Sequence, residues 1–146
     1  MNGSAYYVFD TNVLVSALIF KQSRPGRAFR CALQMGQILL SLPVLEEINE
    51  VMSREKFERY VTAEEREEFL EALVERAHFV NPTESIQACR DLKDDKFLEL
   101  AVNGEASCIV SGDDDLLVLS PFRGIEILRV DNFLERFESG ISDEEE

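Results

Sequence analysis

Residues 6–12, Tyr6-Tyr7-Val8-Phe9-Asp10-Thr11-Asn12, start with four apolar residues that favour β structure and then reach a carboxylate. Such a run predicts a strand buried on both faces, and strands of this kind belong to parallel sheets covered by helices on both sides. Ligands of open α/β sheets bind beside the carboxyl ends of the strands. Asp10 is therefore expected at the edge of a cleft, although an aspartate there can also serve only as the N-cap of the next helix.

A second apolar run reaches carboxylates in the same way near the end of the chain. Cys108-Ile109-Val110 is followed by Ser111-Gly112-Asp113-Asp114-Asp115, and Gly112 permits a sharp turn there. Capping alone explains poorly why two separate buried strands each end in aspartate. We therefore expect Asp10 and Asp113 at the same carboxyl edge of one sheet.

Strands and helices alternate along the chain. The expected strands are 6–9, 38–40, 78–80, 108–110 and 125–128, and the expected helices are 13–20, 27–35, 42–53, 62–77, 96–103 and 131–137. This order predicts an α/β fold with a mainly parallel sheet. At 146 residues, one domain over 1–138 is expected. The remaining residues, 139–146, form an acidic tail that we expect to be disordered.

Two more acids lie at the edges of predicted apolar helix faces. In the helix over 42–53, the helical period directs Glu46 and Glu50 to solvent and leaves Glu47 at the border of the apolar stripe. In the segment leading into the helix over 96–103, Asp94 continues the apolar face, whereas Asp95 falls outside it. Both Glu47 and Asp94 are therefore candidates for a site, with a surface position or an N-cap as the alternatives.

Asp10, Glu47, Asp94 and Asp113 come from four separate elements and are all expected at one edge of the sheet. Carboxylates brought together in a low dielectric repel one another, and a divalent cation removes that penalty. A ligand set of oxygens alone suits Mg²⁺ or Mn²⁺ better than zinc. Such a centre is suited to phosphodiester hydrolysis. Asp91, Asp95, Asp114 and Asp115 are further acids that could hold water or a second ion.

The net charge of −14, from 15 basic and 29 acidic residues, argues against a broad nucleic-acid-binding surface. It suits a metal site or a basic protein partner. The densest basic patch is Lys21, Arg24, Arg27 and Arg30. The three cysteines are odd in number and lack close spacing, so we expect buried free thiols rather than a disulfide or a zinc site. Neither a transmembrane helix nor a secretion signal is expected, which favours the cytoplasm.

The chain resembles a PIN domain in four motifs that occur in the family's order and spacing. They are Phe9-Asp10-Thr11-Asn12, Ser41-x-x-Val44-x-x-Glu47, Arg90-Asp91-x-x-Asp94-Asp95-x-Phe97-Leu98-x-x-Ala101 and Ser111-Gly112-Asp113-x-Asp115-Leu116-Leu117. The resemblance covers about residues 6–137 and is closest to the branch of toxins of toxin–antitoxin systems, related to VapC-type ribonucleases. Each motif alone is weak, and the four together are specific.

This resemblance implies a three-layer α/β/α fold and a Mg²⁺- or Mn²⁺-dependent endoribonuclease, commonly a homodimer inhibited by a small antitoxin protein. By position, Asp10, Glu47, Asp94 and Asp113 match the family's acidic quartet, and Asp115 matches a common fifth acid. Thr11 or Asn12 matches a polar residue that supports the first acid, and Asp91 is a further supporting candidate. In so acidic a chain, either the patch Lys21, Arg24, Arg27 and Arg30 supplies the contacts to RNA, or the natural substrate is bound weakly.

Three other interpretations of the sequence are possible. A phosphoacceptor receiver domain requires an acidic pair after its first strand and a lysine after a late strand, which this chain lacks. A haloacid-type phosphatase requires an aspartate at position 12, where the chain has Asn12. A PIN fold that serves only as a catalytically inactive interaction module remains the alternative, since the sequence argues only mildly against it through its complete set of acids.

Overall fold

The computed structural model describes the backbone of residues 5–145 and the side chains of residues 5–138. At its centre lies a sheet with the strand order β3-β2-β1-β4-β5, in which every paired strand is parallel. The strands are β1 (Ala5–Phe9), β2 (Gly36–Leu40), β3 (His78–Phe79), β4 (Cys108–Val110) and β5 (Glu126–Leu128). The predicted α/β fold with a parallel sheet is confirmed, and the strand that opens the chain lies in the middle of the sheet.

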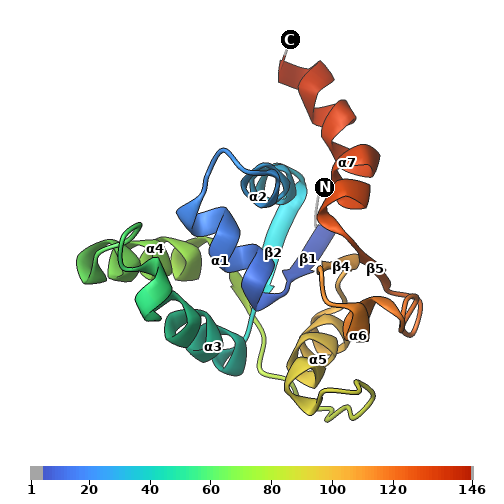
Figure 1. Ribbon diagram of the computed structural model, residues 1–146. Helices are drawn as coiled ribbons and strands as arrows, with labels where there is room; N and C mark the ends of the chain where they lie inside the picture. Colours follow the sequence, from blue (N-terminus) through green and yellow to red (C-terminus); the bar gives the residue numbers. More distant parts are fainter. Residues whose placement is uncertain (1–4, 146) are drawn as a thin grey trace.

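Helices cover both faces of the sheet and complete a three-layer α/β/α fold (Figure 1). They are α1 (Thr11–Ile19), α2 (Arg24–Met35), α3 (Leu42–Met52), α4 (Ala63–Arg76), α5 (Asp95–Gly104), α6 (Asp114–Leu117) and α7 (Val130–Glu145), with 3₁₀ turns at η1 (Glu55–Phe57) and η2 (Leu92–Asp94). Helix α5 packs on β1, β2 and β4, whereas α2 packs against α1 and α7. No helix in the described part of the chain has both the length and the apolarity to cross a bilayer.

The side chains of β1 alternate between the two layers, as the pleat of a strand requires. The Tyr7 ring packs edge-on against Phe133 of α7 at 5.7 Å, and the Phe9 ring packs against Phe29 of α2 at 6.2 Å. Val8, between them, points to the opposite face and is fully buried. Each such large apolar side chain contributes about 1.5–3 kcal/mol on burial, so β1 anchors both helical layers.

Gly36 ends α2 and begins β2, and the reason for a glycine there is steric. Its φ of −178° is extended backbone rather than the left-handed conformation of a usual C-cap glycine. A Cβ at this position would lie 1.9 Å from the carbonyl oxygen of Ala5. The close approach of β1 therefore excludes a side chain.

The predicted helices begin within two residues of the observed ones, apart from α2. Thr62 forms a capping box with Glu65 at the start of α4. Helix α2 begins at Arg24 rather than near Arg27, because the Ser23 hydroxyl caps it and Pro25 is tolerated in the first turn. Asp131, the first residue of the helix predicted over 131–137, lies within the first turn of α7 and forms an ion pair with Arg24.

Helix α4 is only partly buried. Among its apolar residues, Leu73 is buried, Phe69 and Leu70 are partly exposed, and Val74 is exposed. The helix packs beside the sheet, against α3 and β2, so the protein covers only part of its apolar face. All three cysteines are buried free thiols, as expected. The predicted tail, 139–146, falls on residues whose side chains lie outside the described part, and its disorder stays a prediction.

Candidate metal centre

The carboxyl ends of β1 and β4 bring two acidic motifs together, although they are about a hundred residues apart in the chain. The backbone N–H of Asp10 donates to the carbonyl oxygen of Val110 at 3.0 Å, which joins the two strand ends directly. The Ser111 hydroxyl donates to Oδ2 of Asp10 at 2.5 Å and accepts the backbone N–H of Asp113 at 3.0 Å. Ser111 is completely buried, so it fixes the positions of both acids.

Asp10 has the two roles that the sequence left open. Its Oδ1 accepts the backbone N–H of Val13 at 2.9 Å and caps α1, while Oδ2 is held by Ser111 at the sheet edge. The residue is only 5% exposed. Burial raises the pKa of this carboxyl, and the hydrogen bonds from Ser111 and Val13 oppose that shift.

Glu47 lies at the core edge of α3, where the helical period placed it, and Glu46 and Glu50 point into solvent. Its carboxylate already has two partners. Oε1 accepts a hydrogen bond from the buried hydroxyl of Thr11, and Oε2 forms an ion pair with Nζ of Lys96 at 3.2 Å. Glu47 is therefore oriented and partly neutralised by residues of α1 and α5.

Asp94, Asp113 and Asp115 form the tightest group of acids among the described residues. One carboxylate oxygen of each lies within 4.8 Å of the others. Oδ2 of Asp94 is buried and has no hydrogen-bond partner in the described part of the chain. Burial, and next the neighbouring Asp113, raise the pKa of Asp94 to about 7. An unpartnered oxygen among close carboxylates fits a bound divalent cation, because the ion would supply the missing positive charge.

A pocket of about 150 Å³ joins these groups. Its lining consists of Asp10, Thr11, Asn12, Glu47, Val51, Arg54, Asp94, Phe97 and Asp113. The four acids predicted from separate elements thus share one pocket, with Thr11 and Asn12 beside them. Asp115 joins through the acidic group, whereas Asp91 is exposed and its side chain accepts the N–H of Lys93 at 3.0 Å in η2.

Comparison with known proteins gives the family. The family model of the PIN domain matches residues 6–115 of the chain. The chain belongs to the PIN domain family. The uncharacterized protein MJ1680 of Methanocaldococcus jannaschii is 31% identical over 92% of this chain and 93% of that protein.

Two solved structures share the fold of this PIN domain at low identity. The structure of VapBC2 from Rickettsia felis bound to a DNA fragment from their promoter matches 85% of this chain and 98% of that one, with a TM-score of 0.57 at 14% identity. The structure of PAE2754 from Pyrobaculum aerophilum matches 94% of this chain and 91% of that one, with a TM-score of 0.60 at 14% identity. The resemblance to VapC-related PIN domains is thereby confirmed for the fold.

Asp95 differs from its sequence-based interpretation. The helical projection placed it outside the apolar face, yet it is buried, and Asp94 beside it is only half-buried. Oδ1 of Asp95 accepts the backbone N–H groups of Ala88 at 3.0 Å and Cys89 at 2.7 Å. The segment before η2 folds back over the start of α5, so Asp95 holds a loop of the PIN domain in place.

Three residues of the site were missed from the sequence: Ser111, Lys96 and Arg54. Ser111 begins the motif over 111–117, and its place directly after a buried strand, like that of Asp10, could have indicated a role. Lys96 could have been inferred from the need to neutralise an acid near α5. Arg54 gave no local signal, because it follows α3 in an ordinary charged segment.

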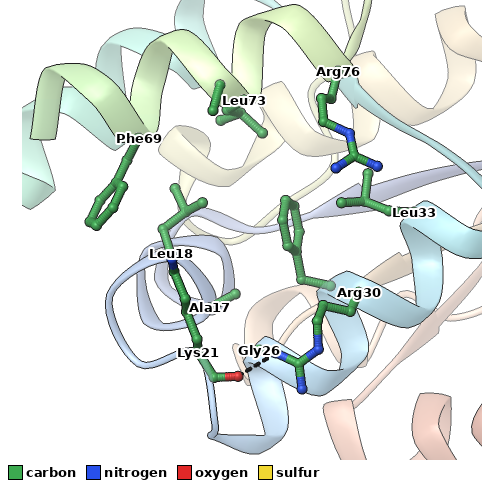
Figure 2. A pocket seen from close by; sticks show the side chains of 11 residues that line it. Ala17, Leu18, Lys21, Gly26, Arg30, Leu33, Phe69, Leu73 and Arg76 are labelled. Atoms are coloured by element: carbon green, nitrogen blue, oxygen red, sulfur yellow. Dashed lines mark hydrogen bonds between the residues drawn. The ribbon is translucent and has the colours of Figure 1, made fainter. Parts of the chain in front are cut away.

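The predicted RNA-binding patch is not a free basic surface. Arg24 forms an ion pair with Asp131 at 3.1 Å, and Arg27 forms one with Glu138 at 2.5 Å, both on α7. Arg30 donates to the carbonyl oxygen of Lys21 at 2.5 Å. Figure 2 shows Lys21 and Arg30 beside a largely apolar pocket of about 280 Å³, lined by residues of α1, α2 and α4. Neither the patch nor this pocket shares a lining residue with the acidic pocket.

Proposed function

We propose that this PIN domain is a Mg²⁺- or Mn²⁺-dependent endoribonuclease that hydrolyses RNA phosphodiester bonds. The observation that carries the proposal is the group Asp94, Asp113 and Asp115, with carboxylate oxygens within 4.8 Å of one another and one buried oxygen left without a partner. Asp10 and Glu47 line the same pocket. A site of this kind is costly for an apo protein, and a hard divalent cation relieves the cost.

Asp10, Asp94, Asp113 and Asp115 would hold the ion, with Glu47 at the edge of the site. When bound, such an ion polarises a phosphoryl oxygen and lowers the pKa of bound water, which suits phosphodiester hydrolysis. Neighbouring side chains hold the acids in position. Ser111 bonds to Asp10 and Asp113, and Thr11 and Lys96 bind the carboxylate of Glu47. Because its pKa is about 7, Asp94 carries a proton part of the time at neutral pH when no ion is bound.

The test is cleavage of a structured RNA in the presence of Mg²⁺ or Mn²⁺. Wild type should cleave, EDTA should stop cleavage, and Asp10→Asn should be inactive. Glu47→Gln and Glu46→Gln form a matched pair, because the two residues are adjacent on α3 but only Glu47 lines the pocket. Activity should fall in Glu47→Gln and persist in Glu46→Gln.

Cleavage that is equal in EDTA, or that persists in Asp10→Asn, refutes the nuclease proposal. An absence of cleavage by wild type favours the alternative, an inactive PIN fold that serves as an interaction module. Single-stranded DNA of the same sequence, assayed in parallel, measures whether RNA is preferred.

We further propose that the protein is the toxin of a toxin–antitoxin pair, acts in the cytoplasm and forms a homodimer. Support for the pairing comes from the shared fold with VapBC2 of Rickettsia felis, whose structure includes promoter DNA. Expression of the wild type alone should arrest growth, and Asp10→Asn should not. A small antitoxin co-expressed from the neighbouring reading frame should restore growth. Light scattering of the purified chain should give the mass of a dimer.

A further inference from the structure

Arg54 is the one lysine or arginine among the described residues that line the acidic pocket. It follows the C-terminus of α3, two turns beyond Glu47, and begins the η1 turn. Its side chain is 49% exposed. The positive charge of Arg54 interacts with the carboxylate of Glu47, one of the acids that line the same pocket.

Arg54 is held in position by a residue outside the pocket. Glu50 accepts two hydrogen bonds from it, from Nε at 3.0 Å and from Nη2 at 2.8 Å. Nη1 has no hydrogen-bond partner in the described part of the chain. The planar fork is thus oriented by Glu50 while one nitrogen remains available to bind an oxygen of a ligand.

The charge of the site explains why such a group is needed. Five acids, Asp10, Glu47, Asp94, Asp113 and Asp115, surround or adjoin the pocket. One divalent ion and the ammonium group of Lys96 do not neutralise them. An approaching phosphodiester therefore meets net negative charge, and phosphate contacts in nucleic-acid complexes come chiefly from arginine and lysine.

The basic patch predicted from sequence is poorly placed to bind a phosphate beside the acidic pocket. Arg24 and Arg27 form ion pairs with carboxylates of α7, as Arg54 does with Glu50, so pairing alone does not distinguish them. The difference is position: Lys21, Arg24, Arg27 and Arg30 do not line the acidic pocket, and Arg54 does. The contact with the substrate is therefore expected at Arg54, beyond the end of α3, and not on α2.

We propose that Arg54, positioned by Glu50, binds a phosphate group of the RNA strand beside the acidic pocket. The inference rests on the proposed nuclease function, in that it names the residue through which that site holds its substrate. Glu50 acts through Arg54 and is a positioning residue.

The test measures binding separately from cleavage. A fluorescently labelled single-stranded RNA is titrated with Asp10→Asn protein, which leaves the RNA intact, in Mg²⁺ and at several salt concentrations. Arg54→Gln in this background should weaken binding about tenfold. It should also reduce the slope of log K against log salt by about 0.7, the value for one phosphate contact to a single strand.

Arg136→Gln is the matched control. Arg136 is 47% exposed and is held by both oxygens of Glu126, as Arg54 is held by Glu50, but it lies on α7 and does not line the pocket. Its loss should leave the salt slope unchanged. Arg54→Lys should keep the slope and lose part of the affinity, because a lysine retains the charge without the fork. Glu50→Gln should fall between wild type and Arg54→Gln.

The inference is overturned if Arg54→Gln binds RNA with unchanged affinity and slope, if Arg136→Gln weakens binding equally, or if the protein binds no RNA. Wild-type cleavage, assayed in parallel, decides the nuclease proposal separately: cleavage without an effect of Arg54 removes only this inference. Circular dichroism confirms that each variant is folded, which is expected because Arg54 is exposed.

Discussion

Replacing Ser111 with alanine should destabilise the protein by about 3 kcal/mol at neutral pH. The Ser111 hydroxyl makes two buried hydrogen bonds, to the Asp10 carboxylate at 2.5 Å and from the Asp113 backbone N–H at 3.0 Å. A bond to a charged group contributes about 1.5–3 kcal/mol and a neutral one about 0.5–1.5 kcal/mol. For a chain of this length, the loss corresponds to a fall in melting temperature of roughly 9 °C.

The effect should depend on pH, because Asp10 is an acid whose pKa is raised in the folded state. Ionisation of Asp10 costs no stability at pH values below its pKa in the unfolded chain, about 4. It has its full cost at pH values above its pKa in the folded protein. Without the Ser111 hydroxyl, the folded pKa rises further, so the cost at high pH grows. The loss in Ser111→Ala should therefore be largest near pH 7.5 and shrink toward pH 4.5.

The assay is urea unfolding of wild type and variant, without metal, at both pH values. Ser53→Ala is the control, because the Ser53 hydroxyl donates to the carbonyl oxygen of Glu50 at 2.7 Å on the surface and its loss should change stability by less than about 0.5 kcal/mol. A Ser111→Ala protein as stable as Ser53→Ala would refute the role of the buried bonds. A loss equal at the two pH values would refute its link to the charge of Asp10.

Three other experiments separate the roles of neighbouring groups in the site. Mg²⁺ or Mn²⁺ should raise the melting temperature more at pH 8 than at pH 6, because Asp94, with a pKa of about 7, must lose its proton to bind the ion. An equal rise in melting temperature at both pH values would count against Asp94 as a ligand. Asp95→Ala should lower the free energy of unfolding by about 2–3 kcal/mol, since two backbone N–H groups lose their acceptor. Calorimetry should nevertheless find an unchanged affinity for the metal ion. A loss of that affinity would show that Asp95 is part of the site. Thr11→Val keeps the shape of a buried side chain but removes the hydroxyl bonded to the Glu47 carboxylate. Urea unfolding should therefore show a loss of about 1.5 kcal/mol, the low end for a bond to a charged group, and a variant as stable as wild type would contradict the bond.

Sequence patterns predicted the sheet and much of the candidate site because the relevant signals are local. The apolar runs before Asp10 and before Ser111 identified β1 and β4, and parallel strands necessarily place their carboxyl ends at one edge. The helical period separated Glu47 from Glu46, since side chains one residue apart on a helix point about 100° apart. These arguments need no knowledge of which segments later come into contact.

The same projection failed for Asp95 because a period describes one helix and not its neighbours. The loop before η2 returns over the start of α5 and presents two N–H groups that a carboxylate can bind. A side chain outside the apolar stripe can therefore still be buried, provided that its polar atoms find partners.

The sequence alone determined that this chain forms a parallel α/β sheet whose strand ends carry acids, since periodicity and composition act over a few residues. Only the tertiary structure decided which charges neutralise one another. It pairs Glu47 with Lys96, and Arg24 and Arg27 with carboxylates of α7. It pairs Arg54 with Glu50 and places Arg54 in the lining of the acidic pocket. Ion pairs depend on distances of a few ångströms between segments far apart in the chain, and those distances exist only once the helices have packed.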